Sequence, residues 1–153
     1  MRALIQRVSQ ASVSVQGNIV AAIEQGLVAL VGVARGDSEA DARYLAEKTA
    51  NLRVFPDESG KFNLSALDIS GEVLVVSQFT LVASTRKGRR PSFTEAAPPE
   101  EAEPLVDTFA QFLRSAGLKA KTGRFQQHML VEIHNDGPVT IFIDSDERLK
   151  PRH

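Results

Sequence analysis

The sequence predicts an α+β fold with a mostly antiparallel sheet system, on three observations. Strand-like segments clearly outnumber helical ones. Two helical segments interrupt the strands without the regular alternation that builds parallel βαβ units. The length of 153 residues fits one domain with a core of its own, and no repeat divides it. We therefore expect a single domain over residues 1–153, in which residues 145–153 form a loose charged tail.

The first third of the chain predicts three strands joined as an antiparallel meander. Residues 4–15 alternate apolar and polar side chains, which is typical of a strand with one buried face. Residues 19–23 and 27–33 are two further strand candidates, and short glycine-containing segments separate all three. Strands this closely spaced in sequence are expected to pair with their neighbours in antiparallel fashion.

Two segments carry helical patterns. The first opens with Ser38-Glu39-Ala40-Asp41, which resembles a capping box, and extends to about Leu52. The second enters at Pro98-Pro99, where proline is tolerated and nearby glutamates complement the helix dipole, and Gly117 is its expected C-cap. The inward-facing residues are expected to be Ala42, Leu45, Ala46 and Thr49 in the first helix, and Leu105, Phe109, Phe112 and Leu113 in the second.

The remaining segments predict further strands. Residues 53–56 read as an edge strand because the proline removes one ladder donor, and residues 62–70 as a loop. The short apolar run 73–76 behind Gly71 is typical of a strand buried on both faces. In the last third we expect strands at residues 118–122, 129–133 and 139–144, the last two joined by a turn at residues 135–138.

Composition excludes several classes of site. The chain has no cysteine, so disulfides, thiolate nucleophiles and zinc-thiolate sites are excluded, and a reducing compartment is favoured. The glycine signatures of Walker and dinucleotide sites are missing. His128 and His134 find no third ligand at a recognisable spacing, so we expect no metal. No apolar run approaches a membrane span or the core of a signal peptide, so a cytoplasmic protein without membrane partners is expected.

The end of the buried strand carries the first candidate chemistry. Ser77, Gln78 and Thr80 follow the apolar run directly, at a place where rigid scaffolds often present functional groups. Ser77 lacks the glycine-flanked elbow of a serine nucleophile, although a triad with His134 and Asp136 or Asp144 can be drawn on paper. Backbone N–H groups and hydroxyls at a strand end can instead cradle a developing oxyanion. The ordinary alternative is that these residues form a turn or a helix cap.

A second candidate is a basic loop, which we define as residues 86–90. It places four cations around Gly88, whereas the formal net charge of the whole chain is −1. Such a loop on an acidic body can steer a polyanion to one place. The alternative is a solvated surface loop. Its cations are Arg86, Lys87, Arg89 and Arg90.

An ordered set of motifs resembles the D-aminoacyl-tRNA deacylases. Ser-Gln-Phe-Thr at 77–80 and Asn-Asp-Gly-Pro-Val-Thr at 135–140 are similar to the two signature motifs of that family. The opening residues 4–13 and Thr-Gly-Arg-Phe at 122–125 look like the same family, so the similarity extends to about Asp144. The resemblance implies a barrel-like arrangement of the sheets with two main helices.

The resemblance also implies an activity. A member of this family is a homodimeric editing hydrolase that cleaves the ester between a D-amino acid, or glycine mischarged on tRNA-Ala, and the terminal ribose of tRNA. It uses no cofactor and has no DNA partner, and its chemistry is attributed to the 2′-hydroxyl of the RNA. A non-catalytic tRNA-binding or RNA-binding module is the alternative, which would show salt-dependent binding without release of amino acid.

The same resemblance assigns roles to residues. It implies that Gly137 and Pro138 form a cis peptide that enters the partner subunit's pocket and excludes L-amino acids. The residues expected to line the pocket are Ser77, Gln78, Phe79 and Thr80, and those expected to support the filter are Arg7, Asn135 and Thr140. The tRNA contacts are expected from Phe125, Met129 and the basic loop. The chain departs from the family pattern at residues 126–128, where Gln-Gln-His replaces small residues.

Overall fold

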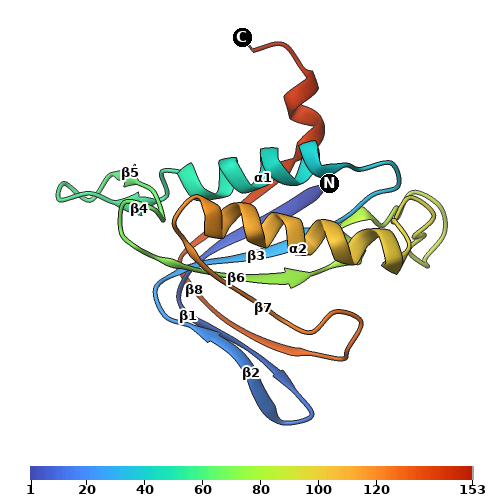
Figure 1. Ribbon diagram of the computed structural model, residues 1–153, viewed down its shortest axis with the longest axis horizontal. Helices are drawn as coiled ribbons and strands as arrows, with labels where there is room; N and C mark the ends of the chain where they lie inside the picture. The colour runs from blue at the N-terminus through green and yellow to red at the C-terminus, as the bar shows by residue number, and fades with distance from the viewer. Residues whose placement is uncertain (153) are drawn as a thin grey trace.

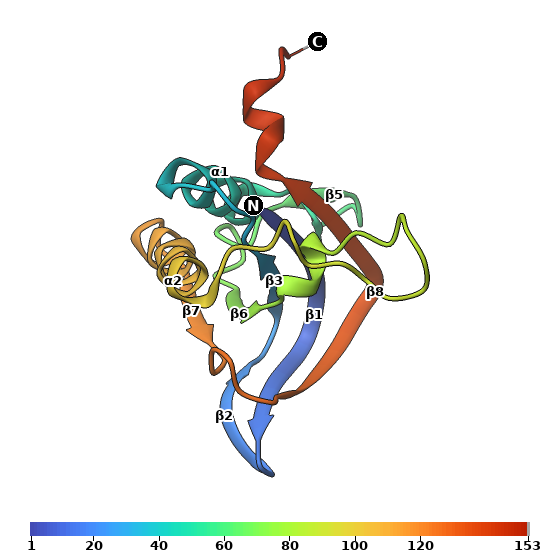
Figure 2. The same ribbon diagram turned by 90° about the vertical axis from the view of Figure 1, so that its right-hand side faces the viewer.

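The computed structural model describes residues 1–152 and has the predicted α+β architecture (Figure 1). Two helices lie side by side on one side of a strongly curved, nearly closed sheet, as the end-on view in Figure 2 shows. The helices are α1 (Glu39–Asn51) and α2 (Pro99–Ser115). The strands of the main sheet are β1 (Arg2–Val15), β2 (Asn18–Ile23), β3 (Gly26–Gly32), β6 (Glu72–Ser77), β7 (Lys119–Thr122) and β8 (Leu130–Asp144).

The long strand β1 organises this sheet. One of its edges pairs with β8 along almost its whole length. Its other edge is shared, because residues 2–8 pair with β3 and residues 11–15 pair with β2. The predicted meander is therefore wrong: β3 follows β2 in sequence but pairs with β1, since a strand of 14 residues is long enough to hold two partners on one edge.

The part of the sheet that ends at β7 is parallel, while the ladders on β1 are antiparallel. β6 lies between β3 and β7 and runs parallel to both. Its residues 73–76 are buried on both faces, as predicted. Val73 and Val75 face the core beneath the helices, whereas Leu74 and Val76 face a second core inside the curved sheet. This alternation follows from the two-residue period of a strand.

Both helices begin as the sequence predicts. The Asp41 carboxylate of α1 accepts a hydrogen bond of 2.8 Å from the Ser38 backbone N–H, which is the reciprocal half of a capping box. In α2 the first turn starts at Pro99, and Gly117 follows the C-cap Ala116 with a φ of +110°. The predicted inner residues of α1 are buried, but Leu105 and Phe112 of α2 are only partly buried, because the helix turns neighbouring residues Ala102, Val106 and Ala110 toward the core.

Residues 135–138 do not form the predicted turn between two strands. β8 is one continuous element that pairs with β1 on both sides of them. Asn135 lies opposite Val8 and Thr140 opposite Gln6, so four residues of β8 face one residue of β1, and the excess bulges out of the ladder. Because β1 supplies a template on both sides, the local turn signal gives a bulge in place of a hairpin.

Two shorter predictions are also corrected. Residues 62–64, expected within a loop, form β5 (Phe62–Leu64), which pairs with the short strand β4 (Phe55–Pro56) in a small separate sheet. Part of the expected loose tail is ordered, since η2 (Ser145–Leu149) is a 3-10 helix. His153, the last residue of that predicted tail, lies outside the described residues.

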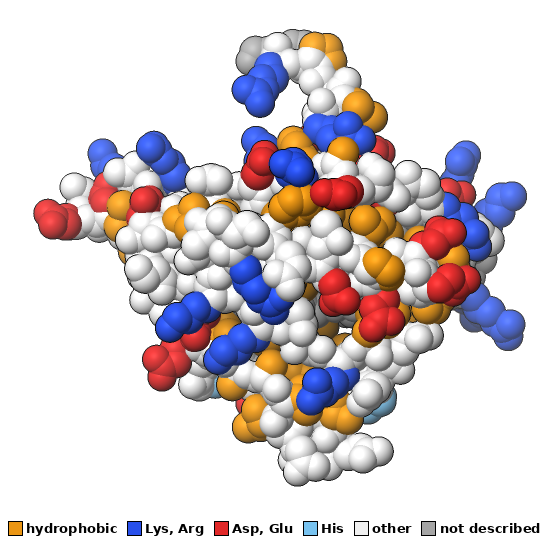
Figure 3. All heavy atoms as spheres, in the orientation of Figure 1, with side chains coloured by type: hydrophobic (Ala, Val, Ile, Leu, Met, Phe, Trp, Pro, Cys, Tyr) orange, Lys and Arg blue, Asp and Glu red, His pale blue; other side chains and the backbone are white. Residues whose placement is uncertain are grey.

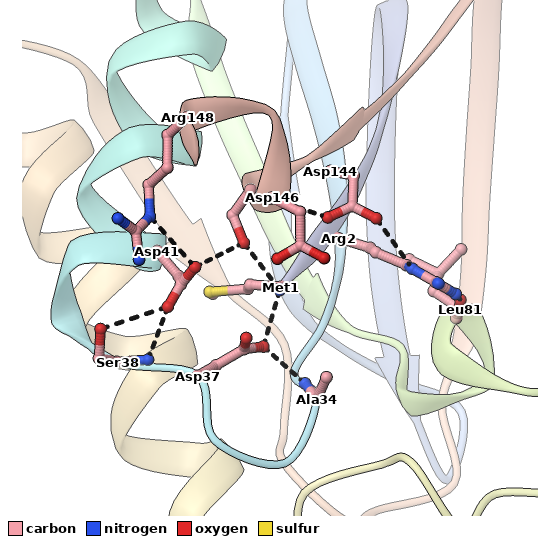
Figure 4. A network of polar contacts seen from close by, with 11 residues as sticks. Met1, Arg2, Ala34, Asp37, Ser38, Asp41, Leu81, Asp144, Asp146 and Arg148 are labelled. Atoms are coloured by element: carbon pink, nitrogen blue, oxygen red, sulfur yellow. Dashed lines mark hydrogen bonds and ion pairs between the residues drawn. The ribbon is translucent and has the colours of Figure 1, made fainter. Parts of the chain in front are cut away.

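A polar network, which we call the terminal network, holds η2 against α1 (Figure 4). The Met1 amino group lies 2.7 Å from the Asp37 carboxylate and donates to the Ser145 hydroxyl at 2.8 Å. That hydroxyl donates to Asp41 at 2.8 Å, and Arg148 lies 3.4 Å from the same carboxylate oxygen. Asp41 and Ser145 are buried, so these contacts satisfy groups that are costly to leave unpaired.

Candidate active site

The strand end that follows β6 turns sharply. Gln78 N–H donates to the Val31 carbonyl at 2.7 Å, and the chain then forms the 3-10 helix η1 (Phe79–Val82). Leu81 N–H donates to the Gln78 carbonyl at 3.1 Å. Within residues 1–152, the backbone N–H groups of Phe79 and Thr80 find no acceptor, as expected at the start of a helical turn. Two amide donors are therefore available at this point, which we call the strand-end turn (residues 77–81).

The strand-end turn borders a cavity of about 600 Å³, which we call the main cavity of this site. Ser77, Gln78 and Phe79 line it, while Thr80 does not and instead accepts a hydrogen bond from the Gln78 carboxamide through its hydroxyl. The opposite wall comes from Phe125 and Met129 and from the segment between them. Sequence reasoning did not foresee the apolar walls from the end of β3 and the start of α2, which are Val33, Ala97, Pro99 and Ala102.

The main cavity is almost entirely neutral. His128, an exposed residue, is the one titratable side chain among the residues that line it. His134 instead lies on β8 within 3.3 Å of Gln10, and neither it nor Asp136 or Asp144 lines this cavity, so no triad forms around Ser77. In residues 1–152 no three His, Asp or Glu side chains gather closely enough to hold a metal ion.

The bulge of β8 gathers the residues of the second motif. Arg7 donates to the Asp136 carbonyl at 2.8 Å and to the Val54 carbonyl at 2.7 Å. Its guanidinium also lies 5.3 Å from the centre of the Phe62 ring, a cation–π contact. Arg7 therefore ties the bulge to β1 and to the segment before β4.

The bulge is also braced from within. The Asn135 carboxamide donates to the Thr140 hydroxyl at 3.0 Å and accepts from the Val139 N–H at 2.8 Å. Gly137–Pro138 is a cis peptide, and both residues are exposed. The structure thus brings all five predicted filter and support residues together, but none of them lines the main cavity of the same chain.

Phe125 and Met129 stand between two hollows. A smaller cavity of about 310 Å³ adjoins the main one and shares four lining residues with it: Ser77, Phe125, Gln127 and Met129. The Arg124 backbone N–H lies 3.4 Å from the Met129 sulfur, and Gln126 has a positive φ of 60°, so the chain makes a tight bend here. Residues 126–128, where the chain departs from the family pattern, all line the main cavity.

The basic loop lies beside this site. The residues that flank it, Ser84 and Ser92, are joined by paired hydrogen bonds of 2.8 Å. Its four cations are exposed and make no ion pair within residues 1–152. Figure 3 shows Lys and Arg side chains projecting at the right-hand edge, where Figure 1 places this loop. Phe93 packs edge-on against Phe79 with ring centres 5.0 Å apart, which links the loop to the cavity wall.

Comparisons with known proteins now decide the family. A family model described as D-Tyr-tRNA(Tyr) deacylase matches residues 4–144. The chain belongs to the D-aminoacyl-tRNA deacylase family. A relative with that name from Roseiflexus sp. (strain RS-1) is 63% identical over 100% of this chain and 99% of its own. A second, from Dehalococcoides mccartyi (strain ATCC BAA-2266 / KCTC 15142 / 195), is 60% identical over 99% of both chains.

Solved structures agree with the deacylase fold. One titled "c-Myc DNA Unwinding Element Binding Protein" has a TM-score of 0.88 and 42% identity, covering 94% of this chain and 98% of its own. Another, titled "Structural Analysis of a probable eukaryotic D-amino acid tRNA deacylase", has a TM-score of 0.77 over the same shares at 17% identity, and supports the fold alone. The family membership makes this chain a tRNA-editing hydrolase, a D-aminoacyl-tRNA deacylase. None of the helices in residues 1–152 is long and apolar enough to cross a membrane.

Proposed function

We propose that this deacylase hydrolyses its substrate with the help of the RNA itself. The observation that carries the proposal is the chemistry of the strand-end turn, which offers two free amide donors and neutral side chains beside a cavity without carboxylates. Such donors stabilise an oxyanion but cannot activate water. When the tRNA end is bound, the 2′-hydroxyl next to the ester bond supplies the group that activates the water.

The reaction that fits this site is a hydrolysis through a tetrahedral intermediate. Water adds to the ester carbonyl carbon, and the carbonyl oxygen takes up negative charge beside the amides of Phe79 and Thr80. The bond between that carbon and the ribose oxygen then breaks, and the ribose oxygen takes the proton that the water loses. The products are the free amino acid and tRNA with an intact terminal ribose.

We propose that selection for D-amino acids comes from a second copy of the chain. Gly137 and Pro138 are exposed on a bulge that does not border its own main cavity, while β8 pairs with β1 along one edge only. A homodimer in which this bulge enters the partner's cavity would set main-chain atoms against an L side chain. Glycine has no side chain, so glycyl-tRNA is also expected to be a substrate.

The remaining predicted residues fit contacts to tRNA in the cytoplasm. Phe125 and Met129 border both hollows, which suits a flat base at the end of the RNA. The basic loop is free to meet phosphates, because its cations are exposed beside Phe93.

The test of RNA assistance uses matched substrates. D-aminoacyl-tRNA with a 2′-hydroxyl is expected to lose its amino acid rapidly, and the same tRNA ending in 2′-deoxyadenosine is expected to react at least about a hundredfold more slowly. Thr80→Ala is expected to keep an appreciable rate. If the deoxy substrate reacts at the full rate and Thr80→Ala is inactive, a threonine nucleophile replaces this proposal.

The test of the partner filter mixes two variants whose own dimers are each expected to have lowered activity. One carries Gln78→Ala together with Ser77→Ala in the cavity, and the other carries Gly137→Ala, whose added Cβ would lie 2.8 Å from Val139 and 3.0 Å from Arg7. Mixed dimers contain one site with two intact halves, so co-expression is expected to restore D-specific deacylation. Absence of restoration, with mixed dimers present in native mass spectra, contradicts a filter supplied by the partner.

A further inference from the structure

The end of β3 approaches the strand-end turn unusually closely. Gly32, the last residue of β3, lies under the turn, and a Cβ built on it would be 2.9 Å from the Gln78 carbonyl oxygen and 3.0 Å from the Leu81 Cβ. The φ of Gly32 is not in the left-handed region, so its backbone does not itself require glycine. The requirement comes from the close approach of the turn, which a methyl group would push outward.

The far end of the same turn is held by a charged side chain. The Arg2 guanidinium donates to the Leu81 carbonyl at 2.8 Å, and its Nε lies 3.4 Å from the Asp144 carboxylate (Figure 4). Arg2 pairs with Gly32 across β1 and β3, and with Asp144 across β1 and β8. Gly32, Arg2 and Asp144 therefore form one row across three neighbouring strands, which we call the support row.

We propose that the support row positions the strand-end turn for catalysis, an inference that rests on the function proposed above. Gly32 sets how closely the turn approaches the sheet, Arg2 fixes its far end, and Asp144 orients the guanidinium. The amides of Phe79 and Thr80 lie between these two fixed points, so the row determines where they aim. A displacement of about 1 Å at such a site can lower the rate on the order of a hundredfold.

Because the side chains of Arg2 and Asp144 are partly exposed, their effect on the rate can be measured apart from any effect on stability. The Arg2 side chain is 39% exposed and that of Asp144 is 27% exposed. Ion pairs at this level of exposure contribute little to folding, because water and salt screen them. Loss of Arg2 is therefore expected to leave the fold nearly unchanged and to act on the rate through the turn.

The experiment compares kcat and KM for D-aminoacyl-tRNA across matched variants. Arg2→Met keeps the length of the side chain without its donors, Arg2→Lys keeps a charge and one donor, and Gly32→Ala adds the methyl group. In Arg2→Met and Gly32→Ala, kcat per folded enzyme is expected to fall at least about tenfold while KM changes by less than about twofold. Arg2→Lys is expected to recover part of the loss.

Two control variants make chemically identical changes elsewhere. Arg43→Met removes an exposed arginine that lies 3.7 Å from Glu39 on α1. Gly71→Ala adds a methyl group to another buried glycine, where the nearest atoms would be 3.4 Å away. Both controls are expected to keep kcat and KM within about twofold of the parent chain.

A fluorescent reporter separates failure of this inference from failure of the proposed function. The chain has no tryptophan, and Phe93 packs on Phe79 of the turn, so Phe93→Trp gives one emission that responds to the turn. Its emission and quenching by acrylamide are expected to change with Arg2→Met and Gly32→Ala but not with the controls. Unchanged emission and unchanged kcat overturn the support row. Changed emission with unchanged kcat overturns its role in the reaction and also the placement of the ester at this turn.

Discussion

The terminal network and the strand-end turn are two polar regions built on opposite principles. The terminal network buries carboxylates and pairs them, with Asp41 accepting hydrogen bonds from Ser38, Ser145 and Arg148 and lying near two positive groups. The strand-end turn carries no charge, and the amides of Phe79 and Thr80 find no acceptor within residues 1–152. A buried charge must be compensated by the protein, whereas an unpaired amide can donate to the negative charge that develops on a bound substrate.

The difference shows that a shifted pKa does not locate the active site of this deacylase. Burial alone would raise the pKa of Asp41, but the hydrogen bonds from Ser38 and Ser145 and the charges of the amino terminus and Arg148 bring it below its usual value. This carboxyl lies in a structural network and not in the main cavity. Perturbed pKa values mark structural ion-pair networks as well as catalytic sites. Stability and turnover should therefore respond to different residues.

The largest expected effect is on stability and comes from Asp41→Ala. The substitution leaves the buried Ser145 hydroxyl without its acceptor and the exposed Arg148 without its carboxylate, so the free energy of unfolding is expected to fall by about 2 kcal/mol. Urea unfolding followed by circular dichroism measures it. Glu47→Ala, at an exposed position of the same helix, is the control. A drop in kcat per folded Asp41→Ala enzyme would break the separation between the two regions.

The acid limit of stability is the next effect. Because the pKa of Asp41 is lower in the folded chain than in the unfolded one, its contribution is complete above the unfolded pKa of about 3.9 and is lost as the pH falls through the folded value. The melting temperature is therefore expected to fall below about pH 4, and to fall less steeply in Asp41→Asn. If the melting temperature falls equally steeply with pH in both proteins, other carboxylates cause the loss of stability in acid.

A substitution in the strand-end turn is expected to have the opposite effect: turnover falls while stability is nearly unchanged. Gln78→Ala removes the carboxamide that donates to the Thr80 hydroxyl and borders the cavity. We expect kcat/KM to fall on the order of tenfold, or about 1.4 kcal/mol in the barrier, while the free energy of unfolding changes by less than about 0.5 kcal/mol. Gln10→Ala, which removes the contact to His134 on the sheet, is the control. A stability loss equal to the rate loss would make Gln78 structural.

The sequence predicted local features of the fold better than long-range ones. The capping box at Ser38 and the proline entry of α2 depend on neighbouring residues, and both appear as expected. The turn signal at residues 135–138 is equally strong, but β1 holds both flanks of that segment and no local pattern shows this. The shared edge of β1 is long-range for the same reason, so the meander could not be corrected from spacing alone.

The candidate site shows the same division. Ser77, Gln78 and Phe79 stand out because polar residues follow a buried strand, and they do line the cavity. Val33 and Ala102 line it as well, yet as ordinary apolar residues of β3's exit and of α2 they carry no chemical signal. The proposed roles of Arg2 and Gly32 can be inferred only from the strand pairing that puts them side by side.

The smallest expected effect comes from the basic loop and tests whether charge acts at a distance from the neutral turn. Replacing Arg89 and Arg90 by glutamine removes two exposed cations next to Phe93. We expect KM for D-aminoacyl-tRNA to rise about threefold at 0.1 M salt with kcat unchanged, and the slope of log KM against log salt to fall by on the order of one. The matched control replaces Arg43 and Lys48, two exposed cations of α1, and is expected to keep the parent slope. If both pairs lower the slope equally, tRNA senses the charge of the whole surface, and the loop has no special part in bringing the substrate to the turn.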